Sequence, residues 1–126
     1  MNKQIINTTN APAPIGPYSQ AVKANGFLFC SGQIALHPQT GELMMADLET
    51  ETKQVMANIK ALLDEASIDF SNIIKTTIFL SDMSLFAKVN EIYGSYFSEN
   101  FPARETVAVK TLPRNVNVEI SVTAVL

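Results

Sequence analysis

The sequence is poor in residue types whose chemistry would otherwise define a function. It has one cysteine, one histidine and no tryptophan among its 126 residues. A disulfide needs two cysteines, and a zinc site needs several cysteine or histidine ligands, so neither is predicted and no metal is expected. A lone thiol fits a reducing compartment, which favours a cytoplasmic protein.

Positive charge and long apolar runs are also scarce. Nine Lys and Arg against twelve Asp and Glu give a net charge of −3, so no basic excess exists to neutralise nucleic-acid phosphates. No apolar run approaches the roughly 20 residues of a spanning helix, and residues 1–10 lack the apolar block of a secretion signal. The five glycines match neither dinucleotide nor Walker spacing. We therefore expect no nucleic-acid partner, no membrane partner and no nucleotide cofactor.

What the chain does contain is enough apolar material for one core. Its hydrophobic content is 47%, and we find no repeat, charge block or linker-like tract in it. A chain of this length matches the commonest size of one domain. The sequence therefore predicts a single domain over residues 1–126.

Turn and periodicity signals predict the secondary structure. Asn25-Gly26 lies between two β-type segments and predicts a hairpin with a type I′ turn. Helical spacing predicts a helix over 48–66 with Asp47 as its N-cap, and Ser84 is expected to cap a second helix ending near residue 97. Strands are expected at residues 3–8, 18–24, 27–33, 73–80, 104–111 and 116–126. This order predicts an α+β domain in which both helices pack on one face of a mixed sheet.

The uncovered sheet face carries the most suggestive polar residues. Alternation places Glu119 on it with Asn117, Ser121 and Thr123, and we expect Arg104, Thr106, Ala108 and Lys110 on the same face. Small residues there would suit close approach by a neighbouring subunit. In one interpretation Arg104 binds a carboxylate ligand and Glu119 transfers a proton or positions a water. In the other, the two residues form a structural ion pair. Spacing alone leaves both open.

Other candidates also have two interpretations. Asn90 interrupts the apolar stripe of the second helix. Its amide would either contact a ligand or form hydrogen bonds with the backbone of a loop. Tyr18 is either a site phenol at the sheet edge or an ordinary half-buried aromatic. Cys30, inside an expected strand, is more typical of a small hydrophobe than of a nucleophile, although a dyad with His37 stays formally open.

Several motifs occur in an order that resembles the RidA (YjgF-type) imine deaminases. They are APIGPYSQ at residues 13–20, SGQI at 31–34, NIK at 58–60, KTT at 75–77, FPAR at 101–104, LPR at 112–114 and VEI at 118–120. The resemblance runs over nearly the whole chain. It implies a homotrimer of chorismate-mutase-like α+β subunits, with ligand clefts between neighbouring subunits.

The resemblance also implies a chemistry, that of a 2-iminobutanoate/2-iminopropanoate deaminase. Such an enzyme hydrolyses 2-imino acids, such as those derived from 2-aminoacrylate, to 2-oxo acids and ammonia without a cofactor. By the same resemblance, Arg104 would hold the substrate carboxylate and Glu119 would position the attacking water. Tyr18, Ser31, Gly32 and Asn90 would line the cleft.

The chain departs from the family pattern at two positions. Thr106 stands where many members have cysteine, and Glu105 stands where serine is common. The Thr106 hydroxyl can still donate a hydrogen bond to a ligand. Glu105 is expected on the face opposite Arg104.

Two other functions stay open at this stage. Members of this family have also been described as ligand sensors or metabolic regulators, which would use the same cleft without chemistry. An RNA-cleaving translation inhibitor is a further reading, which the acidic charge and the lack of a basic aromatic groove disfavour.

Overall fold

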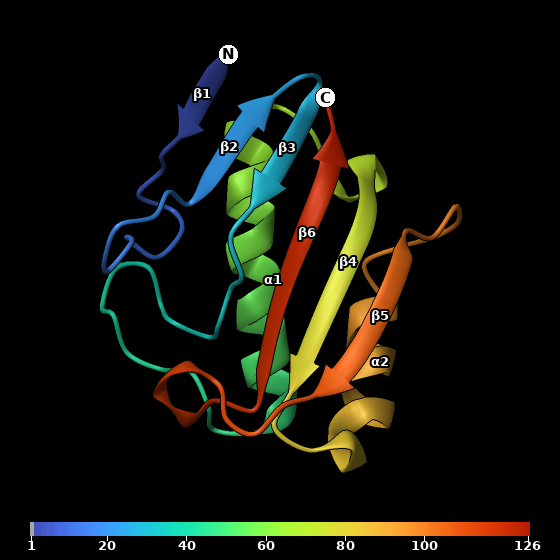
Figure 1. The fold of residues 1–126 in the computed structure, drawn as a ribbon. Helices are drawn as coiled ribbons and strands as arrows, with labels where there is room; N and C mark the ends of the chain where they lie inside the picture. Colours follow the sequence, from blue (N-terminus) through green and yellow to red (C-terminus); the bar gives the residue numbers. More distant parts are fainter. Residues whose placement is uncertain (1) are drawn as a thin grey trace.

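A computed structural model describes residues 2–126 and shows one six-stranded sheet with two helices (Figure 1). The strands are β1 (Lys3–Ile6), β2 (Ala21–Ala24), β3 (Phe27–Cys30), β4 (Ile73–Leu80), β5 (Ala103–Ala108) and β6 (Val118–Val125), and the helices are α1 (Leu48–Glu65) and α2 (Phe86–Gly94). The spatial order is β1-β2-β3-β6-β4-β5, and only the β4–β5 pair is parallel. The predicted α+β class is confirmed. Neither helix is both long and apolar enough to span a membrane.

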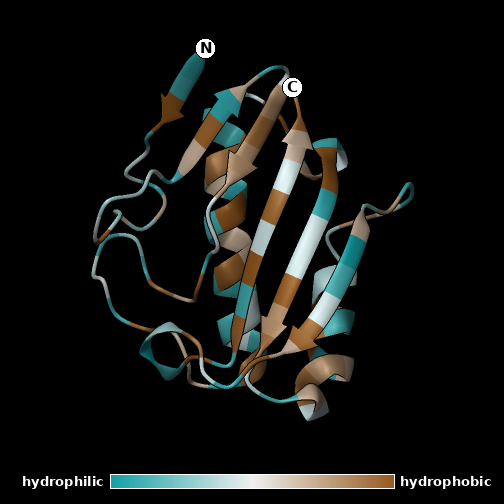
Figure 2. Cartoon of the chain, viewed as in Figure 1, coloured by the Kyte–Doolittle hydropathy of each residue, from teal (hydrophilic) through white to brown (hydrophobic). Residues whose placement is uncertain are grey.

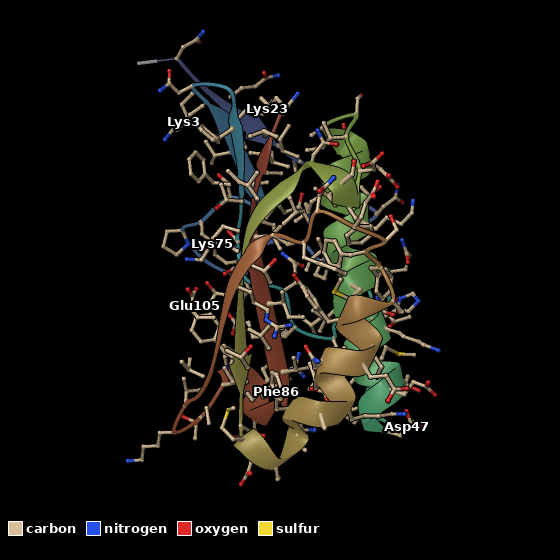
Figure 3. All side chains as sticks on the ribbon, turned by 90° about the vertical axis from the view of Figure 1, so that its right-hand side faces the viewer. Lys3, Lys23, Asp47, Lys75, Phe86 and Glu105 are labelled. Atoms are coloured by element: carbon tan, nitrogen blue, oxygen red, sulfur yellow. The ribbon has the colours of Figure 1, made fainter. Side chains whose placement is uncertain are left out.

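Both helices pack on one face of the sheet, as predicted (Figure 3). The alternation of β6 explains this, because Val118, Ile120, Val122 and Ala124 are buried while the residues between them are only half-buried. The hydropathy alternation along β6 is visible in Figure 2. The opposite face has no helix over it, and Phe29 on that face is 47% exposed.

Local capping signals set the helix boundaries. Asp47 caps α1 through a 2.7 Å bond from the Thr50 amide to its carboxylate, as predicted. The second helix is shorter than expected, because α2 ends at Gly94 and a 3₁₀ turn at Met83–Leu85 precedes it. Asp82, not Ser84, caps this turn, and α2 itself has no side-chain cap.

The hairpin prediction is also confirmed. Asn25 and Gly26 have φ values of 57° and 86°, which the type I′ turn requires, and they join β2 to β3. The strands on either side are shorter than predicted, so Tyr18 lies in the preceding loop and is 53% exposed.

One prediction about the sheet is wrong: Arg104 and Glu119 do not share a face. In the β4–β5 register Arg104 pairs with Thr76, which is fully buried under the helices. Glu119 pairs with Phe79, three residues further along β4, and so lies on the opposite face. Thr106, paired with buried Ile78, is on the helix face with Arg104. Glu105, as predicted, is opposite Arg104, and it pairs with Lys75 at 2.9 Å on the uncovered face (Figure 3).

Candidate active site

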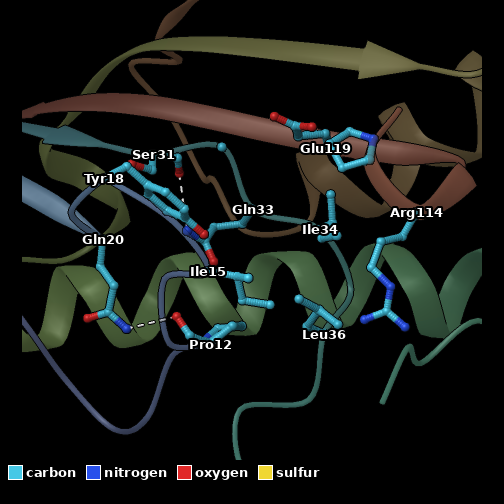
Figure 4. A pocket seen from close by; sticks show the side chains of 12 residues that line it. Pro12, Ile15, Tyr18, Gln20, Ser31, Gln33, Ile34, Leu36, Arg114 and Glu119 are labelled. Carbon is cyan, nitrogen blue, oxygen red and sulfur yellow. Dashed lines mark hydrogen bonds between the residues drawn. The ribbon is translucent and has the colours of Figure 1, made fainter. Parts of the chain in front are cut away.

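A cavity of about 500 Å³ lies where three loops meet beside β6 (Figure 4). Its volume lies within the range of small-molecule sites. The first loop precedes β2, the second follows β3 and the third leads into β6. The lining residues are Pro12, Ile15, Tyr18, Gln20, Ser31, Gly32, Gln33, Ile34, Leu36, Pro113, Arg114 and Glu119.

The first loop is held by a buried glutamine that sequence reasoning missed. Gln20 is 2% exposed, and its Oε1 accepts from the Thr8 amide at 2.8 Å. Its Nε2 donates to the carbonyls of Thr8, Ala11 and Pro12 at 2.9 to 3.2 Å. Because all its polar atoms serve one loop, Gln20 fixes the proline-rich wall of the cavity.

The second loop is fixed on both sides. Gln33 exchanges backbone hydrogen bonds with Ile120 of β6, at 2.8 and 3.1 Å. On the other side, Asn58 of α1 is 1% exposed and its Nδ2 donates to the carbonyls of Ile34 and Leu36 at 3.1 and 2.9 Å. The Ser31 hydroxyl donates a hydrogen bond to the carbonyl of Ser19, at 2.6 Å. The Ser31 amide also donates, to the carbonyl of Gln20 at 3.0 Å, so its carbonyl, which accepts from Gln33 Nε2 at 3.2 Å, is the group that this residue could still offer to a ligand.

Glu119 is the acidic group of the cavity. Burial raises the pKa of its carboxyl above the ordinary value of 4.5. Within residues 2–126 this carboxylate has no hydrogen-bond donor or cation as a partner. It lies against the Cα of Gly32, where a Cβ would overlap Oε2. Only glycine therefore leaves room for the carboxylate in this position, which gives Gly32 a steric role beside Glu119.

The third loop is a strained turn. Arg114 and Asn115 both have left-handed backbone conformations, with φ of 56° and 57°, which non-glycine residues adopt rarely. Glu51 of α1 holds the chain directly after this turn. Its fully buried carboxylate accepts from the Asn117 amide and from Asn117 Nδ2, both at 2.8 Å, and from the Val118 amide at 3.2 Å. Glu119 follows two residues after Asn117. The contacts of Glu51 therefore connect α1 to the start of β6, the strand that carries Glu119.

Arg104 belongs to a second polar cluster, between β5 and α2. Its Nη1 donates to Asn90 Oδ1 at 2.6 Å, and its guanidinium lies 5.6 and 5.4 Å from the ring centroids of Phe86 and Tyr93. Asn90 therefore bonds to Arg104 rather than to a loop backbone. Tyr93 in turn donates its hydroxyl to Thr76 at 2.9 Å. These contacts orient a guanidinium that is otherwise exposed.

Thr106 lies on the same face of β5, two residues beyond Arg104. Its hydroxyl oxygen is buried and has no hydrogen-bond partner among residues 2–126. A buried hydroxyl without a partner is unfavourable unless a ligand or water supplies one.

The two clusters are too far apart to serve one small ligand within a single chain. β4 separates β5 from β6, so the strands that carry Arg104 and Glu119 are roughly 10 Å apart, two strand spacings. Their side chains also leave opposite faces of the sheet. The structural ion pair between them, one alternative from the sequence, does not form.

The remaining candidates do not add a nucleophile or a metal site. Burial raises the pKa of the Cys30 thiol to about 12, which keeps it protonated, and His37 Nδ1 accepts from the Gln39 amide at 3.2 Å within its own loop. The described residues contain no cluster of three His, Cys, Asp or Glu side chains able to hold a metal ion.

Comparisons with known proteins give the family. The sequence model of the family described as Endoribonuclease L-PSP matches residues 8–126. A mouse protein named 2-iminobutanoate/2-iminopropanoate deaminase is 46% identical over 98% of this chain and 91% of its own length. A Yersinia pestis protein of the conserved Rid family has a TM-score of 0.96 at 48% identity, covering 99% of this chain and 100% of that one. E. coli TdcF, solved with bound serine, has a TM-score of 0.93 at 40% identity, covering 98% of each chain. The resemblance noted in the sequence is therefore confirmed, and this chain belongs to the Endoribonuclease L-PSP, or YjgF/RidA, family.

Proposed function

We propose that this chain is a cofactor-free hydrolase that converts reactive 2-imino acids, such as the imine of 2-aminoacrylate, to 2-oxo acids and ammonia. One observation carries the proposal: Glu119, a half-buried carboxylate without a partner and with a raised pKa, projects against Gly32 in a cavity of about 500 Å³. The name of the mouse relative and the serine bound to TdcF support a small substrate that resembles an amino acid. We also propose the cytoplasm as its location, since the lone Cys30 would stay reduced there.

The reaction needs only water and a proton carrier. Glu119 accepts a proton from water as the water oxygen attacks C2 of the C=N bond, which gives a tetrahedral amino alcohol. The same carboxyl group returns the proton to nitrogen. Its carboxylate then accepts the hydroxyl proton as the C–N bond breaks and the C=O bond forms, and gives that proton to the departing nitrogen, which leaves as ammonia. One imine and one water thus give one 2-oxo acid and one ammonia, with no redox change. A carboxyl group with a raised pKa suits both the accepting and the returning step.

We further propose that each site is shared by two subunits of a homotrimer. Arg104 of one subunit would bind the substrate carboxylate by two parallel hydrogen bonds, with Asn90 and Thr106 beside it. The neighbouring subunit would supply Glu119 with Tyr18, Ser31 and Gly32. The separation of the two clusters within one chain supports this arrangement, as does the sheet face without a helix over it. The partnerless Thr106 hydroxyl would then meet the ligand.

The test supplies imine continuously from a serine dehydratase, with semicarbazide present to trap what the protein does not hydrolyse. Wild type is compared with Glu119→Gln, which keeps the shape of the side chain but cannot accept the proton. Glu65→Gln, at an exposed position at the end of α1, is the matched control for the loss of a carboxylate. We expect faster pyruvate release with wild type and with Glu65→Gln, and the background rate with Glu119→Gln.

Three results would contradict the proposal. Equal rates for wild type and Glu119→Gln would remove the assigned role of Glu119. Saturable binding of pyruvate without acceleration by any variant would favour a ligand sensor that uses the same cavity. Cleavage of RNA with the salt dependence of a phosphate contact would favour the activity that the family description names, against the net charge of −3.

A further inference from the structure

The cavity beside Glu119 is larger than a three-carbon imino acid requires. Its volume of about 500 Å³ lies in the range that accepts drug-sized ligands. Away from Tyr18 and Gln20, Ile34 and Leu36 form its wall, and Arg114 lies at that end (Figure 4). Pro113, the residue before Arg114, also lines the cavity. This part of the cavity would face the substrate side chain rather than the reacting carbon, and it combines apolar walls with one guanidinium.

Arg114 is held in place by its backbone. It lies in the left-handed turn described above, between Leu112, which is 9% exposed, and Val116, which is 1% exposed. Glu51 fixes the two residues that follow Val116. The turn is therefore anchored on both sides, and a strained conformation kept in this way is typical of a functional segment.

The charge of Arg114 is available to a ligand. Among residues 2–126, the guanidinium has no carboxylate within ion-pair distance and no hydrogen-bond acceptor. Glu119 is the acidic residue of the same cavity, and it would repel a ligand with a second carboxylate. A cation that lines the same cavity compensates for that repulsion where the ligand side chain ends.

We infer that this end of the cavity is a side-chain subsite in which Arg114 binds the distal carboxylate of dicarboxylic 2-imino acids. The inference rests on the proposed function, because it names a substrate class for the same site. The reaction remains a hydrolysis, in which one dicarboxylic imine and one water give one dicarboxylic 2-oxo acid and one ammonia.

The experiment compares two imines with side chains of nearly equal shape and different charge. Oxidation of aspartate and of leucine by flavin oxidases, with catalase present, supplies the two imines, and semicarbazide competition gives kcat/KM for each. The measured quantity is the ratio of the acidic to the apolar substrate, for wild type, Arg114→Gln and Arg114→Glu. Lys60→Gln is the matched control, since it removes a positive charge from a side chain that is 61% exposed on α1.

We expect the ratio to fall about fivefold in Arg114→Gln, as for one partly exposed ion pair, and roughly twentyfold in Arg114→Glu. Lys60→Gln should keep the wild-type ratio. If the leucine imine is hydrolysed and the ratio is the same in wild type and both Arg114 variants, the subsite is wrong and the proposed function stands.

A binding measurement separates the two proposals. Malate and 2-hydroxy-4-methylpentanoate are stable analogues of the same pair, and their Kd ratio needs no turnover. An Arg114-dependent Kd ratio without hydrolysis of either imine would support the subsite and reject the hydrolase. A Kd ratio that does not depend on Arg114 would reject the subsite.

Discussion

If Arg104 and Glu119 act from different subunits, two inactive variants should restore each other's activity. Arg104→Ala removes the carboxylate-binding half of a site, and Glu119→Gln removes the water-activating half. Each variant alone contains only defective sites. A mixed oligomer contains some sites in which the intact Arg104 of one subunit meets the intact Glu119 of its neighbour.

The recovered fraction follows from cyclic symmetry. A mixed trimer has three interfaces, and in either composition only one of them joins an intact Arg104 to an intact Glu119, so activity should recover to about one third of wild type. A mixed dimer would recover about one half by the same reasoning. The recovered activity therefore reports the number of subunits as well as the shared site.

The assay uses coexpression of the two variants with different affinity tags and purification over both tags in sequence. Light scattering checks that each variant assembles, and mixing the separately purified variants just before the assay is the control for the absence of exchange. Recovery no higher than that of the single variants would refute the reasoning, because it would mean that one chain supplies both groups to each site.

Three further predictions concern single residues around Glu119. Gly32→Ala should lower kcat about tenfold or more with little change in Tm, because the added methyl group displaces a carboxylate that must be positioned for attack. Activity should rise with pH through the raised pKa of Glu119. The unfolding free energy should fall over the same pH window above 4.5, because there the folded chain binds more protons than the unfolded chain. Glu119→Gln should abolish both trends and raise Tm at pH 7. Glu51→Ala should lower the unfolding free energy measured in urea by about 3 kcal/mol, because it leaves buried donors of Asn117 and Val118 without an acceptor, and Glu51→Gln should lower it less.

The sequence predicted most elements because their signals are local. Asn25-Gly26 requires positive φ, Asp47 caps the helix that follows it, and β6 alternates over its whole length. Each signal depends on residues a few positions apart. Strand ends were predicted less well, since pairing with a neighbour decides where β2 and β3 stop.

The face of Arg104 could not be predicted, because alternation shows which residues of a strand lie together but not on which side of the sheet. On β5 one set is Arg104, Thr106 and Ala108 and the other is Ala103, Glu105 and Val107, so neither set is clearly more apolar. Only the pairing of Arg104 with Thr76 decides the question.

The buried polar residues that support the cavity left a weak signal. Glu51 is in the first turn of α1, where an acidic residue usually serves the helix dipole. It also lies four residues before Val55 and eight before Ile59, both fully buried, so it falls on the apolar stripe. Asn58 interrupts the same stripe. A polar residue on a buried stripe indicates that a backbone needs a partner, but the identity of that backbone requires the fold.

The register of β5 decides on which face of the sheet Arg104 lies relative to Glu119. A shift by one residue would turn Arg104 to the face that carries Glu119, although β4 would still lie between the two strands. α2 opposes this shift, because Tyr93 donates to Thr76, the partner of Arg104 on β4, while Asn90 accepts from the guanidinium. The opposite placement of Arg104 and Glu119, on which the proposed sharing of a site between subunits rests, is thus set in part by helix-to-strand contacts inside one chain. Substitutions on α2 that weaken these contacts should therefore reduce activity while the cavity around Glu119 stays intact.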